Sequence, residues 1–396
     1  MFVRKAVINN INDLIDIIKK TKCHNSVYES FIKKGIFNII IIEKIDNISA
    51  NILKQEAISI GSDVAINKDI SKFKKGVSDV VLFVSSYKIN KLIEKLEIQC
   101  FSDLKRLAVE LKSITLCNEK KFKYKNCEID ISNPVVMGII NMDLNSFSGD
   151  GFINPDLACK RAIEFEKNGA KIIDIGGESS RPGSDMLDVK IEINRVIPAL
   201  KKIRKNVSIP ISIDTYKYET AKIAIEEGAD IINDIFALKY GGEKLAKLIS
   251  NTKTGIIIMH TRGIPKNMQI NPVYKNCVSE IYNFLNLKKK YLNNFGVEDD
   301  YIAVDPGIGF GKSVEHNIEL IKNMNIFSSI GVVVGAVSRK NFIKSISGNN
   351  SKFSFVTMNF IAALYGANIL RVHDVKETVD ILNIIKMFKR NIININ

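Results

Sequence analysis

Three polar residues that follow separate β-rich runs are the first candidates for chemistry in this sequence. Asp214, Asn233 and Asp305 each end such a run, so all three would project into one mouth if the runs are parallel strands of a barrel. A buried carboxylate without donors is costly. With no evident metal-ligand cluster in the sequence, two carboxylates and an amide suit a neutral ligand edge rich in N–H groups, such as a guanidine-like heterocycle. Capping of the following helix is the alternative role for each residue.

Two further segments favour an anion. The segment GGESSRPGS begins at Gly176, and its glycines, proline, hydroxyls and arginine are typical of an anion-binding loop; a plain surface turn is the alternative. The other segment comprises the residues after the last two predicted strands, where barrels often bind phosphate and where arginine can match phosphate oxygens bidentately. These residues are Ser338, Arg339, Lys340, Arg371 and His373. For His373 and Asp374 the alternative is a local turn pair.

Other motifs give weaker signals. GFGK at residues 309–312 resembles a phosphate-binding glycine loop but lacks the Walker spacing, so a close backbone turn is the better interpretation. His260 and Arg262 have no nucleophile partner at a recognisable spacing, so nothing favours a Ser/His/Asp hydrolase. The six cysteines are scattered without a C-x-x-C pair, and there are only four histidines. We interpret these cysteines as reduced and mostly structural.

The elements that must position these residues alternate between strands and helices. The pattern predicts a (β/α)₈ TIM barrel, because eight strand candidates in about 260 residues fit its usual length of about 250. The main competitor is a doubly wound sheet, which is disfavoured because no G-x-G-x-x-G follows the first strand. The predicted strands are residues 135–140, 171–175, 211–213, 230–232, 255–259, 302–304, 331–334 and 369–372.

The first third of the chain predicts a separate, smaller α/β domain. Apolar residues at helical spacing over residues 8–20, 88–98 and 102–114 predict helices, and the runs at Phe37 and Asp79 predict buried strands. Residues 121–131 then alternate around Asn126 like a hairpin that could plug the floor of a barrel. We therefore expect an N-terminal α/β extension of unknown role at residues 1–120 and a barrel with an N-terminal hairpin at residues 121–396.

The composition limits the kinds of partner that the chain is expected to bind. The chain has 396 residues, of which 46% are hydrophobic and 25% charged, as in a soluble globular protein, and its formal net charge is +14. Nucleic-acid binding is disfavoured, because the lysines are interleaved with glutamate at solvent-face helical spacing. Positive charge also suits anionic small substrates. The N-terminus has no export signal, and the longest apolar runs are too short to span a bilayer. We therefore expect a cytoplasmic protein.

The motifs together resemble dihydropteroate synthase over residues 122–388. In order, they are MGIIN, GGESSRPGS, SIDT, IND, MHTRG, DPGIGFGK, SRK and RVHD. The resemblance implies a transferase of folate biosynthesis that joins 6-hydroxymethyl-7,8-dihydropterin diphosphate to 4-aminobenzoate and releases diphosphate. It also implies a TIM barrel that uses Mg²⁺ and dimerises through its outer helices.

The resemblance further implies a role for each matching residue, with Asp214, Lys340 and Arg371 as the catalytic residues. The pterin would be held by Asp214, Asn233, Met259, Asp305 and Lys340. The diphosphate would be held by Asn141, Arg371 and His373, with Asn141 near the Mg²⁺. The aminobenzoate would be covered by Phe147, Ser180, Arg181 and Pro182, with Ser338 near its carboxylate.

The first loop departs from the family pattern. Where the family usually reads N-V-T-P-D-S-F-S-D-G-G, residues 141–151 read N-M-D-L-N-S-F-S-G-D-G. Thr-Pro-Asp is replaced by Asp143, Leu144 and Asn145, and the later Asp-Gly is inverted at Gly149 and Asp150. Two alternatives therefore stay open. One is a related barrel that passes a methyl group from methyltetrahydrofolate to a corrinoid, and the other is a non-catalytic pterin-binding homologue.

Overall fold

A computed structural model describes residues 11–24, 27–71, 75–115, 121–142, 154–179, 183–348 and 351–389. The chain divides into two compact units, one formed by residues 1–118 with 390–396 and the other by residues 119–389. Each unit has its own hydrophobic core. Within the described residues, no helix combines the length and the apolar character needed to cross a membrane.

The N-terminal unit is the small α/β region that the sequence predicts. Its antiparallel sheet has the order β1 (Phe37–Asp46), β3 (Val77–Ser85), β2 (Asp63–Ala65). Leu82 of β3 is fully buried among apolar residues of the helices, whereas Ile39 of β1 is 65% exposed. The helices are α1 (Ile11–Lys20), α2 (Tyr28–Gly35), α3 (Asn47–Ser59), α4 (Lys68–Ser71), α5 (Ile89–Glu97) and α6 (Ser102–Thr115).

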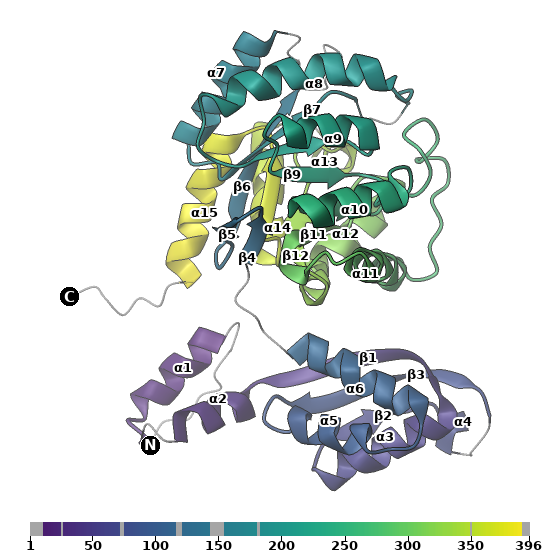
Figure 1. Cartoon of the computed structure of the whole chain (residues 1–396). Coiled ribbons are helices and arrows are strands. Elements are labelled where there is room, and N and C mark those ends of the chain that lie inside the picture. The colour runs from purple at the N-terminus through teal and green to yellow at the C-terminus, as the bar shows by residue number, and fades with distance from the viewer. Residues whose placement is uncertain are drawn as a thin grey trace. The chain divides into compact units, whose positions relative to one another are not determined.

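The second unit is a closed barrel of eight parallel strands, which confirms the predicted fold class and shows that the doubly wound alternative is wrong. Figure 1 shows the helices arranged around these strands. The strands are β6 (Val135–Asn141), β7 (Ile172–Gly176), β8 (Ile211–Asp214), β9 (Ile231–Asp234), β10 (Gly255–Met259), β11 (Ile302–Asp305), β12 (Val332–Gly335) and β13 (Ile369–Val372).

The helices that follow the strands cover the outside of the barrel. Outward side chains such as Ile173 and Ile213 pack with helix residues such as Leu200 in one continuous core. The helices are α7 (Pro155–Lys167), α8 (Val189–Arg204), α9 (Tyr218–Glu226), α10 (Gly242–Thr252), α11 (Cys277–Asn294), α12 (Val314–Lys322), α13 (Asn341–Ser347), α14 (Lys352–Leu364) and α15 (Val375–Lys389). Two 3₁₀ turns, Asp299–Tyr301 and Met324–Ser329, precede β11 and β12.

A hairpin closes the N-terminal end of the barrel. Strands β4 (Lys121–Tyr124) and β5 (Cys127–Asp130) pair with each other, and Figure 1 shows them at one end of the barrel. Phe122 is fully buried against inward residues near the start of the strands, including Met137, Ile172 and Ile257. Because successive residues of a strand alternate between its faces, the inward residues further along the strands then form the opposite, polar end.

The hairpin provides a prediction for stability. We expect Phe122→Ala to lower the free energy of unfolding of the barrel unit by about 3–5 kcal/mol, because it removes a buried ring and leaves a cavity. Urea-induced unfolding of the full chain measures this change. The matched control is Phe353→Ala, since Phe353 is 85% exposed and its loss should change stability by less than about 0.5 kcal/mol. Identical unfolding curves for the two variants would contradict the packing role of the hairpin.

Candidate active site

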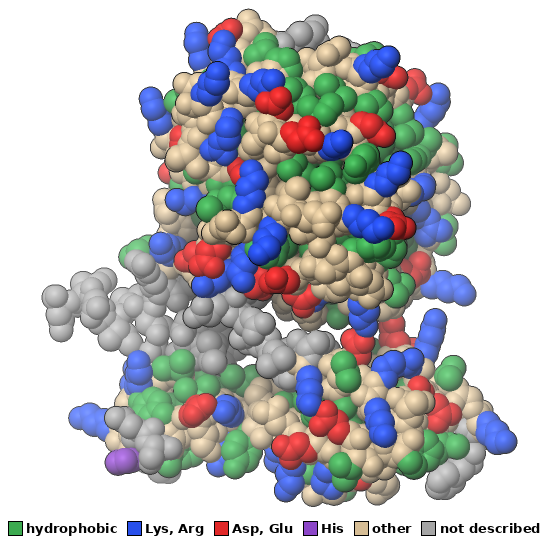
Figure 2. All heavy atoms as spheres, viewed as in Figure 1, with side chains coloured by type: hydrophobic (Ala, Val, Ile, Leu, Met, Phe, Trp, Pro, Cys, Tyr) green, Lys and Arg blue, Asp and Glu red, His purple; other side chains and the backbone are tan. Residues whose placement is uncertain are grey.

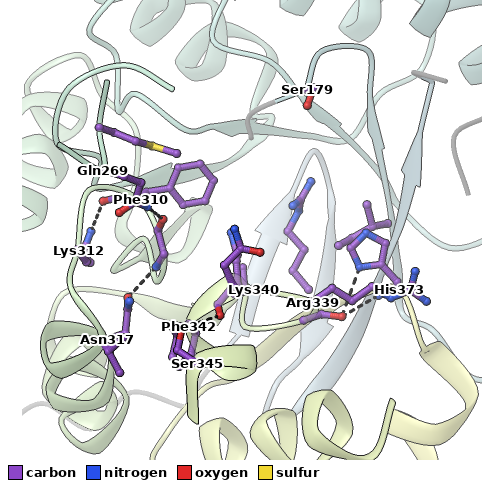
Figure 3. Close-up of a pocket in the computed structure, with 18 of the residues that line it drawn as sticks. Ser179, Gln269, Phe310, Lys312, Asn317, Arg339, Lys340, Phe342, Ser345 and His373 are labelled. Carbon is purple, nitrogen blue, oxygen red and sulfur yellow. Dashed lines mark hydrogen bonds between the residues drawn. The ribbon is translucent and has the colours of Figure 1, made fainter. Parts of the chain in front are cut away.

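Polar side chains gather at the C-terminal end of the barrel strands around a cavity of about 400 Å³. Figure 3 shows Arg339 and His373 at one side of this cavity, Phe310, Gln269 and Lys312 at the other, and Lys340 between them. Seven of the candidate site residues named in the sequence analysis line the cavity. They are Asn141, Asp214, Ser338, Arg339, Lys340, Arg371 and His373.

Arg371 connects two acids that come from neighbouring strands. Its Nε donates to Oδ2 of Asp174 at 2.7 Å, and its Nη2 donates to Oδ2 of Asp214 at 2.6 Å. Nη2 also lies 2.7 Å from the same Asp174 oxygen. The amide of Asn233 reaches Asp174 at 3.4 Å. The barrel mouth is therefore organised around one arginine shared between two carboxylates, which fixes the plane of its guanidinium.

Sequence reasoning missed Asp174. It is fully buried within β7, where the local sequence KIIDIGG is otherwise apolar apart from the lysine at its start. An acid inside an apolar strand is a usable signal, because burial requires that it find a donor. Polar residues at strand ends do not include it, because Asp174 lies two residues before the end of β7.

Burial changes the pKa values of Asp214 and Lys340, two residues that are expected to bind the edge of the heterocycle. Burial raises the pKa of Asp214 to about 7, although Arg371 opposes the shift and Asp174 adds to it. Burial lowers the pKa of Lys340 to about 8, against the attraction of Asp305. Both groups therefore change protonation close to neutral pH, as is common for residues of functional sites.

Asn233, Asp305 and Met259 are not among the residues that line the cavity. Asn233 and Asp305 are only 5% and 3% exposed. The backbone N–H of Gly307 donates to Oδ1 of Asp305 at 2.7 Å, and this bond opposes the rise in the pKa of Asp305 that burial causes. Met259 packs in an apolar cluster whose other members include the cavity residues Phe310 and Met268.

The side of the cavity that contains Arg339 and His373 receives positive charge from Arg339 and Arg371. Burial, together with Arg339 and Arg371, lowers the pKa of His373 well below its ordinary value, so its imidazole is neutral. The Ser338 hydroxyl lies 3.3 Å from Nδ1 of His373. Nη2 of Arg339 donates to Oδ1 of Asp374 at 3.0 Å. Asp374 therefore pairs with an arginine that lines the cavity, and not with His373 in a local turn.

Further lining residues went unassigned in the sequence. Glu178 accepts from the Tyr216 hydroxyl at 3.0 Å and pairs with Lys217; its signal is the single acid within GGESS. Lys312 is the lysine of GFGK, and burial lowers its pKa to about 7. Its amine bonds Nδ1 of His260 at 3.1 Å, which makes His260 a packed residue at a strand end.

Part of the predicted site lies outside the described residues. This holds for Phe147, Ser180, Arg181 and Pro182, and for the altered first-loop residues 143–150. Among the residues that are described, no group of three or more His, Cys, Asp or Glu could hold a metal ion. The only side chain proposed for metal contact is thus the amide of Asn141, at the cavity wall.

Comparison with known proteins identifies the barrel. A family model described as "Pterin binding enzyme" matches residues 137–373. A dihydropteroate synthase of Streptococcus pyogenes is 38% identical over 260 residues, which cover 64% of this chain and 95% of the relative. A bifunctional dihydropteroate synthase/dihydropteroate reductase of Helicobacter pylori is 33% identical over 362 residues and covers 89% of this chain and 91% of the relative.

Solved structures agree with these relatives. The crystal structure of Yersinia pestis dihydropteroate synthase with a sulfonamide drug has a TM-score of 0.65 and 32% sequence identity. The match covers 68% of this chain and 99% of the Yersinia chain. Together with the barrel and the arrangement of polar groups at its mouth, these comparisons show that the chain belongs to the dihydropteroate synthase family of pterin-binding enzymes.

Proposed function

We propose that this chain joins 6-hydroxymethyl-7,8-dihydropterin diphosphate to 4-aminobenzoate and releases diphosphate. The observation that carries the proposal is the sharing of Arg371 between Asp174 and Asp214 in a cavity that also contains His373. Acceptors for the N–H groups of a pterin therefore lie beside donors for an anionic leaving group. A methyltransferase of the related pterin barrels would have no use for the cationic side of this cavity.

At the pterin end, the proposed ligands are the buried acids and Lys340. The carboxylates of Asp214 and Asp305 and the amide of Asn233 accept the N–H groups of the ring, and Lys340 donates to its carbonyl and ring nitrogen. Met259 packs on the ring as an adaptable apolar side chain. The burial of Asp214, Asp305 and Lys340 supports this assignment, because hydrogen bonds to charged groups are strong in a site that excludes water.

At the other end of the cavity, Arg371 and His373 bind the diphosphate. Nη1 of Arg371 has no acceptor among the described residues, so it can donate to a phosphate oxygen, and neutral His373 can donate from one ring nitrogen. The bond between the pterin methylene and the diphosphate oxygen breaks, and its electron pair leaves with the diphosphate. The reduced pterin delocalises the resulting positive charge, and carboxylates beneath the ring favour this state more than the ground state.

The aminobenzoate nitrogen then attacks the methylene carbon, the C–N bond forms, and the nitrogen loses a proton to solvent. We assign Ser338 to the carboxylate of this second substrate, and Phe147, Ser180, Arg181 and Pro182 to the loops that cover it. The cavity position of Ser338 supports its part in this assignment. Loops over the site exclude water, the competing nucleophile.

We also propose that Mg²⁺ takes part. Its usual sites combine one or two protein oxygens with water and substrate phosphates, and the amide oxygen of Asn141 beside the cationic groups fits such a site. When bound, the ion would neutralise charge on the departing diphosphate. We further propose that the chain works as a cytoplasmic homodimer on small substrates and not on nucleic acid. On the face seen in Figure 2, Lys and Arg side chains are interspersed with Asp and Glu.

A condensation assay tests the main proposal. The full chain is supplied with the pterin diphosphate, labelled aminobenzoate and Mg²⁺, and the formation of labelled dihydropteroate and of diphosphate is followed. We expect both products to form in equal amounts. Tight binding of the pterin without condensation would instead favour a non-catalytic homologue, for which the altered first loop offers a reason.

One observation favours a second activity, reduction of the dihydropteroate product. The Helicobacter pylori relative covers 89% of this chain, whereas the barrel unit makes up about two thirds of it, so the similarity extends into the N-terminal unit. That relative is named as both a synthase and a reductase. We propose that this chain also adds a hydride and a proton across the C=N bond of the dihydropterin, with a reduced nicotinamide or reduced flavin as the two-electron donor.

Donor oxidation tests this second activity. The full chain is mixed with dihydropteroate and either reduced nicotinamide or reduced flavin, and tetrahydropteroate is measured by chromatography. We expect one donor to be consumed in equal amount with the product. No product with either donor would contradict the reductase proposal and leave the synthase proposal intact.

The pKa values predict how pterin binding depends on pH. The carboxylate of Asp214 must be ionised to accept N–H groups, and its pKa of about 7 means that affinity rises as pH increases through 7. Lys340 must be protonated to donate, and its pKa of about 8 means that affinity falls above pH 8. Titration calorimetry between pH 5.5 and 9.5 should therefore give a bell-shaped profile with its maximum between pH 7 and 8. A flat profile would contradict these assignments.

Lys340→Arg is the matched variant for the alkaline side of this profile. A guanidinium stays protonated throughout this range, so the fall in affinity above pH 8 should disappear. The rise through pH 7 should remain, because it belongs to Asp214.

A further inference from the structure

Asp174 contacts two residues that are proposed to bind the substrates. Its Oδ2 accepts from Nε of Arg371 at 2.7 Å and from the amide of Asn233 at 3.4 Å. Through Arg371 it is also linked to Asp214. One fully buried side chain therefore touches a residue assigned to the diphosphate and a residue assigned to the pterin, and it is one hydrogen bond away from a third.

The charges around Arg371 show what Asp174 does for its neighbours. If Asp214 were the sole partner of this arginine, the two would form a closed one-to-one ion pair, and the carboxylate would be occupied before a ligand arrived. With Asp174 as the second anion, two negative charges share one positive charge. Asp214 thus keeps acceptor capacity for a ligand, and the guanidinium is anchored on its Nε side.

A second observation is that the acceptors beneath the site are not all used. Oδ1 of Asp174 and Oγ of Ser212 are buried side-chain atoms without a hydrogen-bond partner among the described residues. The two residues are neighbours on the parallel strands β7 and β8, so their side chains lie on the same face of the sheet. The bonds of Asp174 to Arg371 and Asn233 show that this face is the inside of the barrel. Buried polar groups are normally satisfied, and an unsatisfied carboxylate oxygen is retained at a cost to stability.

We propose that Asp174 is a positioning residue, which holds Arg371 between the two ends of the cavity so that this arginine can bind the leaving group while Asp214 stays available to the pterin. The inference rests on the proposed function and adds to it a residue that does not itself line the cavity. Asp174 acts through Arg371 and takes no part in bond making or breaking.

The variant Asp174→Asn tests this role, since it keeps the size and one acceptor oxygen but removes the charge. Two probes are used on the full chain, inorganic diphosphate and 6-hydroxymethylpterin, neither of which requires catalysis. We expect Arg371 to move onto Asp214, so that both probes bind at least about 10-fold more weakly, which corresponds to a loss of about 1.4 kcal/mol in binding free energy. In turnover, KM for the pterin diphosphate should rise together with a fall in kcat.

The pH profile separates positioning from a general loss of stability. The charged groups that act on Asp214 include Arg371, Asp174, Glu192, Glu178 and Lys340. Removing the negative charge of Asp174 should shift the rise in pterin affinity to lower pH, because a neighbouring anion no longer opposes ionisation of Asp214.

The matched control is Asp230→Asn at the start of β9. Asp230 is also a buried acid that pairs with an arginine, since its Oδ2 accepts from Arg204 at 2.8 Å. It also pairs with Lys125 of the hairpin turn, at the closed end of the barrel. This variant should lower the melting temperature but leave the affinity for both probes and the pH profile unchanged.

The outcomes separate this inference from the proposed function. Native-like binding of both probes and an unshifted profile in Asp174→Asn would overturn the inference, whereas failure of the native chain to condense its substrates would overturn the function alone. If Asp174→Asn does not fold, Asp174→Ser serves instead, because it also removes the charge and leaves a small polar side chain at this fully buried position. Unchanged diphosphate binding in that variant would equally overturn the inference.

Discussion

The Asp214→Ala variant is expected to lose at least about 100-fold in affinity for the pterin diphosphate while remaining folded. Each hydrogen bond to a charged group contributes about 1.5–3 kcal/mol, and a pterin edge offers more than one donor to this carboxylate. The fold should persist because Arg371 keeps its bond to Asp174. Titration calorimetry gives the affinity, and circular dichroism reports the fold.

Asp214→Asn is the matched variant for this prediction. It keeps the shape and one acceptor oxygen, so its affinity should lie between those of the native chain and the alanine variant. It should also lose the rise in affinity through pH 7, because an amide does not ionise. Native affinity in the alanine variant, or loss of diphosphate binding alone, would show that Asp214 does not hold the pterin edge.

Gly307→Ala is expected to have the second large effect, this time on the fold of the mouth. Gly307 has a φ of +71°, and an added Cβ would lie 1.8 Å from the carbonyl oxygen of His260. A left-handed backbone costs other residues about 1–2 kcal/mol, and forced backbone shifts in a packed site typically cost about 1–3 kcal/mol more. The shift should also break the 2.7 Å bond from Gly307 to Asp305.

The measurement is urea-induced unfolding of the full chain together with pterin affinity. We expect a loss of about 2–5 kcal/mol in the free energy of unfolding, as the sum of these two costs, and a pterin affinity too weak to measure. The matched control is Gly348→Ala, which has a similar φ of +74° but no atom within 4 Å of the added Cβ. Equal losses in the two variants would show that the contact with His260 is unimportant.

The strand ends were predictable from the sequence because barrel topology alone places them together. Asp214, Arg371 and Lys340 line one cavity, although more than thirty residues separate each from the next along the chain. That outcome needs only parallel strands of similar length, which the apolar runs indicate. The same reasoning predicted the small N-terminal α/β unit, but β2, with three residues, is too short to give a periodic signal.

The inner layer of the site was not predictable in this way. Asp174 stands one inward position below Gly176, the last residue of β7, and a rule based on strand ends passes over it. The sequence also did not show which predicted residues reach the cavity, since Asn233 and Asp305 are buried and are not among its lining residues. The pKa values of Asp214 and Lys340 depend on this burial, and residue type alone carries no information about it.

The hairpin at the base of the barrel has a consequence for kinetics. Phe122 and its neighbours fill that end of the barrel, so among the described residues the cavity lies at the C-terminal end of the strands, and ligands reach it from that side. In the proposed reaction the pterin lies deeper in this cavity than the aminobenzoate, so the pterin has to bind first, and the coupled product has to leave before the next pterin can enter. Steady-state turnover should therefore follow an ordered mechanism, in which the aminobenzoate binds only to the complex of the chain with the pterin diphosphate.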